Sequence, residues 1–563
     1  MSKTNIKIIT KHLINHNYCQ NVNMKALIVI PARGSSKGIP KKNMRRLGNK
    51  PLIAYPIEKA LKLKDVLYNH HFDIVVSSDD EYIEEYVSLY PDVRFINRSE
   101  KLSKDDIPLG PVIYDAFLKS STNYDFVITL VPTMPLLSVE TMKKAIKKYL
   151  SQKRHKSLIL VSDATHIYWQ NGKPLTKREN RQLLDPVYQE CGGIVITSSR
   201  FLKTRRQILT KKPCLYICPP DESVDINSWF DFILAEKLLN RRKIGFKVGG
   251  NYKAGLGNVY RCINLALRFI EHESYFFIDE REKEAIDVVK SYFFKVVKYK
   301  TSSQLTTLVK YHGVDVIIND TLGIDTAFAA VMNGMLIPVI SFDEPNKNCC
   351  ALTINPQFEF SDVSTNNLYG YKYSVLREDV LMFPIKNYPE STKNILITMG
   401  GSDPEHVTVQ ILKYLTNYKN ITVVVSKYFD KQDKQKINNL AKKHGFCIAE
   451  NVKFMGMHLY NADIVITSNS STVYDSVSLG TLTIAIDKVK DEKTHLFSPF
   501  SGAVMYLGYH KNISRAKFKK ALKILCYDIP TKTIMYNYLV KYAEEIRGGQ
   551  KIVKEKINEV LNR

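Results

Sequence analysis

The chain has 563 residues, 44% of them hydrophobic and 24% charged, and carries a formal net charge of +25 at pH 7. Domains usually hold about 100–200 residues, so this length and this ordinary globular composition predict two or three domains rather than one. The positive charge comes mainly from scattered lysines, without a compact basic run that carries interleaved aromatics, which argues against nucleic-acid binding. A polyphosphate substrate, or simply a lysine-rich proteome, explains the charge better.

From Lys25 onward, short apolar runs alternate with amphipathic segments, which is the rhythm of a parallel α/β sheet. Buried strands are expected at 26–32, 73–78, 125–132 and 157–164. A new strand, glycine-rich loop and helix begin near 244, and the same rhythm then fills about 245–375 and about 392–530. We therefore expect an α/β protein with an N-terminal extension at 1–23, a first domain at 24–243, and two further lobes at 244–385 and 386–563.

The segment 31–53, PARGSSKGIPKKNMRRLGNKPLI, directly follows the first predicted strand. Gly34 and Gly38 allow a tight turn and a close approach of backbone N–H groups to phosphates. Arg33, Lys37 and Lys42 supply cations at intervals that suit a triphosphate. A basic glycine-rich loop is a weak signal by itself, and its spacing here differs from that of a P-loop. Its place between the first strand and a predicted helix favours a nucleotide site.

This loop resembles the signature of the CMP-sialic acid synthetase (acylneuraminate cytidylyltransferase) family, P-A-R-G-G-S-K-G-I-P-x-K-N, with Ser35 in place of a glycine. The likeness continues through the first domain in the family's order. Four further segments carry it, namely VVSSDDEYI (75–83), NRSEKLSKDD (97–106), LVPTMPLL (130–137) and VDINSWFDFILAEKLL (224–239).

The resemblance implies a nucleotide-diphosphosugar-transferase (Rossmann-like) fold and an enzyme in which an acidic sugar attacks the α-phosphate of CTP and pyrophosphate leaves, with Mg²⁺ on the phosphates. It implies nucleotide contacts from Ala32, Arg33, Gly34, Ser35, Ser36, Lys37, Lys42, Asn43, Asp79 and Arg98. It also implies that Arg33, Lys37 and Asp225 serve catalysis, that Asp225 and Asn227 hold the metal, and that the N-terminal domain forms a homodimer. Asp79 has an alternative interpretation as the N-cap of the helix that follows it.

Three positions depart from the family's pattern. Asn227 stands where the family often has a second metal carboxylate, and an amide is the weaker Mg²⁺ ligand. Val131 and Leu137 replace the usual Gln and Arg of the Pro-Thr-x-Pro motif, near the expected sugar pocket. These changes leave CTP as the expected nucleotide. The sugar is expected to be a nonulosonic acid of the sialic, pseudaminic or legionaminic kind, and the apolar side chains favour a less polar, deoxy member.

Residues 245–530 resemble, more loosely, the UDP-sugar hydrolase of pseudaminic acid biosynthesis and its spore-coat polysaccharide relatives, which have a two-lobed GT-B fold. The matching stretches are 255–267, 315–320, 373–379, 395–408 and 462–486. The resemblance implies contacts to a UDP-linked sugar from Gly257, Asn258, Arg261, Gly400, Gly401, Ser402, Asp403, Ser470, Ser471, Thr472 and Asp475. The paired glycines of MGGSDPE (399–405) predict a diphosphate site at a helix N-terminus, with SSTVYD (470–475) facing it across the cleft.

Catalysis in this half is a separate question. The hydrolases carry a histidine in the first loop, where this chain has Asn258, and asparagine cannot act as a general base. The half is therefore a glycosyltransferase-like or nucleotide-sugar-binding region, a hydrolase that uses another base, or a scaffold. We expect His312, His406, His458 and His495 to be surface or capping residues.

The cysteine content and the hydropathy of the chain indicate its surroundings. The nine cysteines are odd in number, widely spread and without paired metal-ligand spacing, so free thiols in a reducing cytoplasm are expected. No stretch approaches the roughly 18 uninterrupted apolar residues of a membrane-spanning helix. We therefore expect a cytoplasmic protein without a membrane span.

Overall fold

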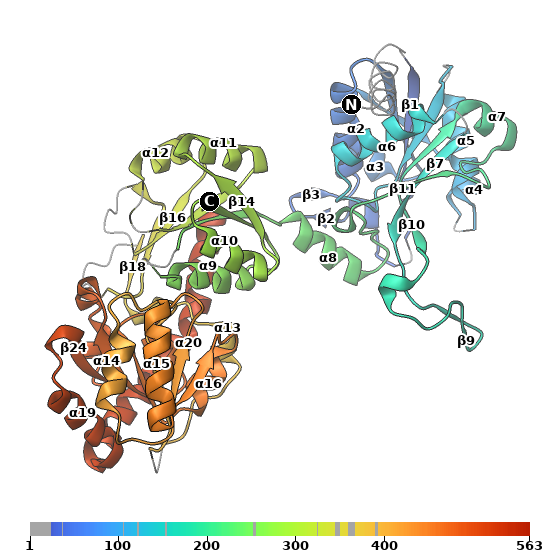
Figure 1. The fold of residues 1–563 in the computed structure, drawn as a ribbon. Coiled ribbons are helices and arrows are strands. Elements are labelled where there is room, and N and C mark those ends of the chain that lie inside the picture. Colours follow the sequence, from blue (N-terminus) through green and yellow to red (C-terminus); the bar gives the residue numbers. More distant parts are fainter. Residues whose placement is uncertain are drawn as a thin grey trace, which may run out of the picture. The chain divides into compact units, whose positions relative to one another are not determined.

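The structure is a computed structural model that describes residues 24–36, 38–104, 106–120, 123–152, 155–250, 255–321, 323, 325–343, 349–358, 366–388 and 392–562. The predicted extension at 1–23 and Lys37 lie outside the described residues. The chain divides into two compact units, Met1–Arg241 and Arg242–Arg563, drawn from blue to green and from green to red in Figure 1.

The first unit is built on a seven-stranded sheet. Its strands lie in the order β11 (Cys214–Ile217), β7 (Ser157–Asp163), β10 (Tyr188–Ser198), β6 (Phe126–Leu130), β1 (Lys25–Pro31), β4 (His71–Ser78), β5 (Val93–Asn97). β10 runs antiparallel to both neighbours, and the other pairs are parallel. The four strands expected from hydropathy appear as β1, β4, β6 and β7, with ends within two residues of the predicted ones.

Helices cover both faces of this sheet. Successive residues of β1 point to opposite sides, and because residues 26–30 are all apolar, both faces must be buried. Ala26, Ile28 and Ile30 pack in one buried cluster, and Leu27 and Val29 pack in the other. The helices are α2 (Ala54–Val66), α3 (Glu81–Val87), α4 (Glu100–Ser103), α5 (Leu109–Lys119), α6 (Val139–Ser151), α7 (Ser199–Arg205) and α8 (Trp229–Leu239). The short strands β2 (Arg46–Leu47), β3 (Lys50–Pro51), β8 (Trp169–Gln170) and β9 (Lys173–Pro174) form two hairpins.

The second unit begins with an all-parallel seven-stranded sheet, which forms its first lobe. The order is β14 (Lys295–Tyr299), β13 (Glu273–Asp279), β12 (Lys243–Val248), β15 (Val316–Asp320), β16 (Val339–Phe342), β17 (Leu352–Asn355), β18 (Asn367–Tyr369). Its helices are α9 (Gly257–Arg268), α10 (Lys283–Ser291), α11 (Ser302–His312) and α12 (Thr326–Gly334). The strand order reverses between β12 and β15, as in doubly wound nucleotide-binding sheets.

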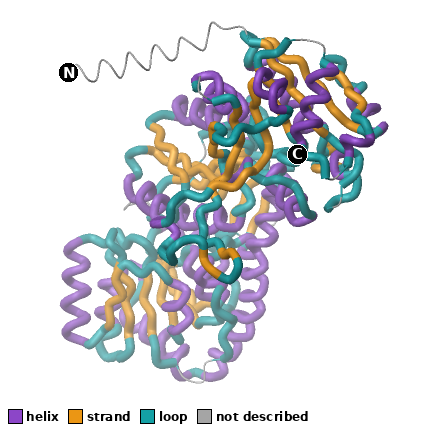
Figure 2. The backbone as a smooth tube through the Cα atoms, turned by 90° about the vertical axis from the view of Figure 1, so that its right-hand side faces the viewer, coloured by secondary structure: helices purple, strands orange, loops and turns teal. Residues whose placement is uncertain are grey.

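The second lobe repeats this plan with six parallel strands, flanked by helices in Figure 2. The order is β21 (Cys447–Glu450), β20 (Ile421–Val425), β19 (Ile395–Thr398), β22 (Ile464–Ser468), β23 (Leu482–Asp487), β24 (Val504–Tyr509). Its helices are α13 (Glu378–Leu381), α14 (Val407–Tyr414), α15 (Lys431–His444), α16 (Met455–Asn461), α17 (Ser471–Ser478), α18 (Phe497–Phe500), α19 (Arg515–Tyr527) and α20 (Ile529–Leu561). The predicted fold class, α/β with a two-lobed GT-B-like second region, is confirmed.

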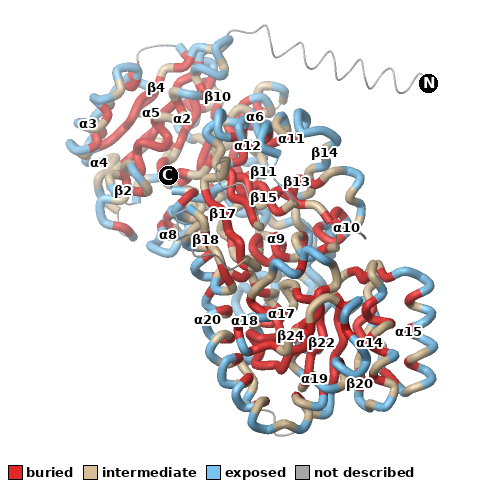
Figure 3. Tube along the Cα trace, turned by 90° about the vertical axis from the view of Figure 1, so that its left-hand side faces the viewer, coloured by how far each residue is buried: buried red, intermediate tan, exposed pale blue. Residues whose placement is uncertain are grey.

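The 33-residue helix α20 ties the two lobes of the second unit together. Met535 packs in the core of the second lobe, whereas Val553 and Ile557 pack in the core of the first. Lys554 forms an ion pair with Glu271 of the first lobe at 2.7 Å. In Figure 3 the buried residues follow the strands of each sheet, and α20 alternates buried and exposed residues along its length. Within the described residues, no helix is both long enough and apolar enough to cross a membrane.

Candidate functional site

The first candidate site lies at the carboxyl ends of β1 and β4, adjacent parallel strands of the first unit. The loop after β1 approaches β4 closely, since Gly34 N donates a hydrogen bond to Asp79 Oδ1 at 3.1 Å. A Cβ atom on residue 34 would lie 2.5 Å from Asp80 Oδ2. Only glycine permits this approach, and the carboxyl edge of a parallel sheet is where α/β proteins bind ligands.

Asp79 and Asp80 have separate roles. Asp80 is the N-cap of α3, and its carboxylate accepts hydrogen bonds from the backbone N–H groups of Tyr82 at 2.9 Å and Ile83 at 3.2 Å. The alternative interpretation of Asp79 as the helix cap is therefore wrong, because the cap falls one residue later. Asp79 instead fixes the loop through Gly34.

Arg98 and Asn43 hold the neighbourhood of the loop after β1 in place through hydrogen bonds to backbone carbonyls. Arg98 is 6% exposed, and its guanidinium donates to Ser77 O at 2.6 Å at the end of β4. Burial lowers the pKa of Arg98, and the negative charge of Asp79 opposes this effect. Asn43 Nδ2 donates to Arg33 O at 2.8 Å, which fixes the backbone of the most prominent loop cation. Of the other predicted nucleotide contacts, Ala32 is buried, Ser36 is partly buried and Ser35 is exposed.

The other end of the loop contacts the segment that contains Asp225. A Cβ atom on residue 38 would lie 2.3 Å from Asn227 O, so Gly38 is required there as well. Lys42 Nζ donates to Ile226 O at 2.7 Å. Burial lowers the pKa of Lys42, and the nearby Asp225 carboxylate opposes this. The loop therefore places cations between two acidic segments, which matches the needs of a metal-bound polyphosphate.

Asp225 and Asn227, the predicted metal ligands, lie side by side. Asn227 Nδ2 donates to Asp225 Oδ2 at 2.7 Å, which leaves Asp225 Oδ1 and the amide oxygen of Asn227 for a cation. No group of three or more His, Cys, Asp or Glu side chains suited to a metal occurs among the described residues. One carboxylate and one amide fit Mg²⁺ only when the phosphates of a nucleotide complete its octahedron, and this is how Mg²⁺ is usually held.

The Pro-Thr-x-Pro motif follows β6 and joins this site through the backbone, since Ile226 N donates to Thr133 O at 2.8 Å. Leu137 is 1% exposed and packs in the core beside Gly193, so its side chain belongs to the protein interior rather than to an open sugar pocket. Val131 is only partly buried at the end of β6 and can still face a ligand.

Lys59 was not identified from the sequence. Its Nζ atom donates to Pro135 O in the Pro-Thr-x-Pro motif. Burial lowers the pKa of Lys59 to about 7, helped by Lys50 and opposed by Glu222. Glu222 in turn accepts a hydrogen bond from Ser138 N at 2.8 Å. A lysine in an amphipathic helix is usually solvated, and no local signal marks this one.

The second candidate site lies in the second unit, where loops of both lobes meet. Asn258 Nδ2 donates to Asp320 O at 3.3 Å, so the side chain that replaces the family's histidine faces the first lobe's own backbone. Arg261 is 9% exposed, pairs with Asp320 at 2.5 Å and with Asp343 at 2.7 Å, and lies over the ring of Phe342. Its guanidinium thus pairs with two carboxylates, and its predicted contact with a nucleotide sugar stays a prediction. Gly257 begins α9 in the same loop.

The MGGS loop follows β19 in the second lobe. Gly400 has φ +85°, which favours glycine, and a Cβ atom on Gly401 would lie 3.7 Å from Leu256 Cβ of the first lobe. The Asp403 carboxylate accepts hydrogen bonds from the first two N–H groups of α14, Val407 N at 3.0 Å and Thr408 N at 2.7 Å. The buried Ser402 precedes it. Two helix N–H groups are therefore already taken by a carboxylate, which leaves the glycine loop as the stronger anion site.

Lys488 is the cation of this loop and was also missed. It directly follows β23, and its Nζ atom donates to Met399 O and Ser402 O, both at 3.0 Å. The ammonium group also lies 3.9 Å from the position of a Cβ atom on Gly400. A charged residue immediately after a buried strand is the signal that could have identified it.

The SSTVYD segment is arranged differently from the prediction. It lies after β22, which pairs in parallel with β19, so it shares one edge of one sheet with the MGGS loop and does not face it across a cleft. Ser470 precedes α17, Ser471 and Thr472 begin it, and the side chain of Asp475 turns inward. Burial raises the pKa of Asp475 to about 7, against the effect of the nearby Arg377.

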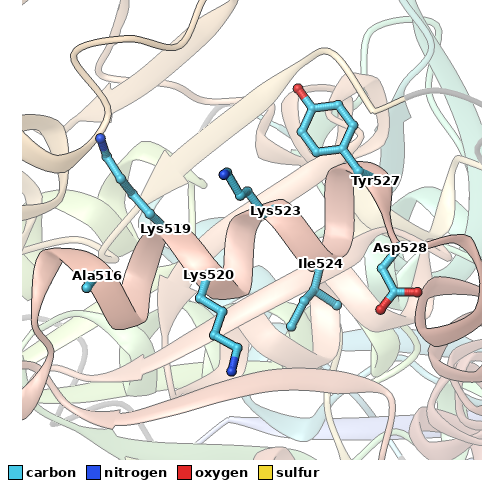
Figure 4. Close-up of a pocket in the computed structure, with 7 residues that line it drawn as sticks. All are labelled: Ala516, Lys519, Lys520, Lys523, Ile524, Tyr527 and Asp528. Carbon is cyan, nitrogen blue, oxygen red and sulfur yellow. The ribbon is translucent and has the colours of Figure 1, made fainter.

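His495 is not a surface or capping residue. It is partly buried, and its Nδ1 atom contacts Asn469 O at 2.5 Å. His406 does occupy the N-cap position of α14. A separate hollow, drawn in Figure 4, is lined by one face of α19 and by Asp528, which follows that helix. Lys519, Lys520 and Lys523 do not all point the same way there. No side chains converge in that hollow, so it offers no comparable site.

Residues 27–190 match the family model described as cytidylyltransferase. A pseudaminic acid cytidylyltransferase of Campylobacter jejuni is 35% identical over 233 residues, which cover 38% of this chain and 96% of that protein. A CMP-N,N'-diacetyllegionaminic acid synthase of Legionella pneumophila is 31% identical over 232 residues, covering 38% of this chain and 97% of that protein. An uncharacterised protein of Methanocaldococcus jannaschii is 29% identical over 265 residues, and the chain spans only 54% of its length.

Two solved structures each resemble a part of the chain. A CMP:2-keto-3-deoxy-manno-octonic acid synthetase in complex with CTP covers 38% of this chain and 98% of its own, at 16% identity and a TM-score of 0.30. MurG of Acinetobacter baumannii covers 56% of this chain and 99% of its own, at 11% identity and a TM-score of 0.42.

Proposed function

Because the chain belongs, through its N-terminal unit, to the cytidylyltransferase family, we propose that this unit transfers CMP from CTP to a nonulosonic acid. The sugar's anomeric hydroxyl attacks the α-phosphate, and pyrophosphate leaves. The observation that carries the proposal is that the loop after β1 is closed at two points, by the contact of Gly34 with Asp79 and by the contact of Gly38 with Asn227. This closure holds Arg33 and Lys42 where the charge of a triphosphate develops.

The residues of the site have separate roles in this reaction. Lys42 is fixed by Ile226 O beside Asp225, so its ammonium group neutralises phosphate oxygens without rearrangement. Asp225 and the amide oxygen of Asn227 would hold Mg²⁺ together with the nucleotide phosphates. When bound, Mg²⁺ supplies charge neutralisation and orients the leaving pyrophosphate. Lys59 and Glu222 fix the Pro-Thr-x-Pro segment on the side expected to take the sugar.

The names of the relatives direct the choice of sugar. Pseudaminic, legionaminic and N-acylneuraminic acids, named for the relatives, are all acidic nonulosonic acids. The test is pyrophosphate release by the full chain with CTP, Mg²⁺ and each of these acids in turn. Release with CTP and at least one acid supports the proposal. Equal release with UTP or ATP, or release without an acidic sugar, contradicts it.

We also propose that the N-terminal unit forms a homodimer through the arm between β7 and β10. In this arm Trp169 is 59% exposed, Leu175 is 60% exposed and Leu183 is 69% exposed. So many exposed apolar side chains are unusual for a short segment. A second copy of the arm would cover them. Sedimentation of the full chain tests this, and a W169S/L183S variant that remains in the same state as the wild type would contradict the assignment of this surface.

For the second unit we propose binding of a nucleoside diphosphate sugar. Its support is the MGGS loop, where Gly400 frees backbone N–H groups and Lys488 adds a fixed cation at the carboxyl edge of a parallel sheet. Calorimetry with UDP should show binding that Lys488→Met weakens about tenfold or more, whereas Lys490→Met, an exposed neighbour, should leave it unchanged. Lack of UDP binding would leave the scaffold alternative. UDP release only in the presence of a sugar acceptor would assign a glycosyltransferase.

A further inference from the structure

Two partly buried polar residues that no predicted role uses lie where the two lobes of the second unit meet. One is His495, in the segment after β23 of the second lobe, and the other is Asp343, directly after β16 of the first lobe. The contact between the lobes at this point is explicit. Tyr474 of α17 donates to Pro356 O at 2.9 Å, and the ring of Phe358 lies edge-on to the His495 ring at 6.0 Å.

The hydrogen bond of His495 determines its tautomer. Nδ1 lies 2.5 Å from a carbonyl oxygen, that of Asn469, and a carbonyl only accepts, so the Nδ1 atom carries the proton. Asn469 is itself held by Asp487 Oδ1 at 3.0 Å and by Ser498 Oγ at 2.6 Å. The ring is thus fixed with Nε2 unprotonated, which is the form of a proton acceptor.

Asp343 is an unusual residue on the opposite lobe. Its backbone has φ +49°, an uncommon value for a residue other than glycine, and its N–H donates to Ile354 O at 3.1 Å. One carboxylate oxygen pairs with Arg261 at 2.7 Å. The other, Oδ1, is buried without a hydrogen-bond partner among the described residues. A buried carboxylate oxygen without a donor is costly unless a ligand or a charged partner supplies one.

Charged groups of both lobes act on His495. Burial lowers the pKa of His495, its hydrogen bond to Asn469 O and the carboxylates of Asp343 and Asp487 raise it, and Arg261 lowers it. The net effect is a lowered pKa, so the imidazole is neutral at neutral pH and ready to accept a proton. Asp343 favours the imidazolium that such a transfer would create.

We propose that His495 is the general base of the second unit, with Asp343 of the opposite lobe stabilising its protonated form, and that the pair activates water against a nucleoside diphosphate sugar. The inference rests on the proposed nucleotide-sugar site. A water O–H proton passes to Nε2, the water oxygen bonds to the anomeric carbon, and the bond from that carbon to the phosphate oxygen breaks. The electron pair leaves with the nucleoside diphosphate, whose negative charge is stabilised by Lys488 and by the backbone N–H groups of the Gly400 loop. His495 thus supplies from the second lobe the base that Asn258 cannot supply from the first.

The first test measures the imidazole directly in the full chain labelled with ¹⁵N-histidine. His495, assigned by its loss in His495→Gln, should be neutral at pH 7.5 with its proton on Nδ1. A proton on Nε2, or a charged ring at this pH, overturns the proposal.

The second test follows UDP release from UDP-N-acetylglucosamine between pH 5 and 9. His495→Gln should bind UDP as the wild type does but release it about 10²–10⁴-fold more slowly. Wild-type release should fall as pH drops through the pKa of His495, and Asp343→Asn should move this limb to lower pH because it removes a charge that raises that pKa. His458→Gln, in α16 of the same lobe, is the matched control and should behave as the wild type.

The outcomes separate this inference from the site on which it rests. Wild-type protein that binds no UDP contradicts the proposed nucleotide site. UDP binding with no release at any pH, or release by His495→Gln at the wild-type rate, overturns the assignment of His495 alone. A large gain of release in Asn258→His would also overturn it, because it would show that the second unit lacks a base.

Discussion

Replacing Gly38 with alanine adds one methyl group at the point where the phosphate-binding loop meets the Asp225 segment. That methyl carbon would lie 2.3 Å from Asn227 O, and real Cβ atoms essentially never come closer than 3.0 Å to such an atom. Loop and segment must therefore separate by roughly 1 Å. The residue has an ordinary φ, so backbone strain adds nothing and the effect is a displacement.

The size of the effect follows from where the displacement falls. A misplacement of about 1 Å between reacting groups can cost about 100-fold in rate. Overpacking costs about 1–3 kcal/mol in a closed core, and the low end applies here because Gly38 is exposed and the loop can move outward. For a unit of this size, each kcal/mol lowers the melting temperature by about 2–4 °C. Gly38→Ala should therefore lose activity far more than stability.

The assay is pyrophosphate release from CTP with a nonulosonic acid, alongside a thermal melt of the same sample. Gly548→Ala is the control, since this exposed glycine in α20 has no atom within 4 Å of an added Cβ, and alanine there should be neutral or slightly stabilising. Wild-type turnover in Gly38→Ala would refute the proposed closure of the loop against Asn227. A large loss of stability with unchanged turnover per folded molecule would assign Gly38 a purely structural role.

Three further predictions follow from the same sites. Asp475→Asn should raise the unfolding free energy above pH 7 by up to about 4 kcal/mol, because burial raises the pKa of Asp475 to about 7 and the wild type therefore loses stability as pH rises from about 4 to 7. Denaturant titrations of both proteins at pH 5 and pH 8 check this, and an equal difference in unfolding free energy at the two pH values would contradict it. Arg33→Ala should slow CMP transfer about 30- to 1,000-fold with little change in melting temperature, measured by the pyrophosphate assay, whereas an intact rate with a much lower melting temperature would make Arg33 structural. A chain that begins at Met24 should retain most of its activity in that assay, and loss of most turnover would contradict the interpretation of 1–23 as an extension.

Much of the fold could be predicted from the sequence, because the burial of a strand and the chemistry of a loop depend on residues that are close together in the chain. Five uninterrupted apolar residues in β1 pack on both faces of its sheet, and such a run has few alternatives to a buried parallel strand. The glycines and cations of residues 31–43 are close together in the chain, so their spacing and their place after the first strand indicated a phosphate loop. The reversal of strand order in both later lobes likewise follows from repeated βαβ units.

Only the tertiary structure decided which distant residues meet. Lys59 contacts Pro135, Lys488 contacts Met399, and the ring of His495 lies edge-on to Phe358. None of these pairs leaves a periodic trace in the sequence. The sequence placed SSTVYD opposite the MGGS loop, whereas the pairing of β19 with β22 puts both on one sheet edge. The physical reason is that hydropathy records whether a side chain is buried, while the identity of its neighbours depends on the order in which strands pair, which no single segment encodes.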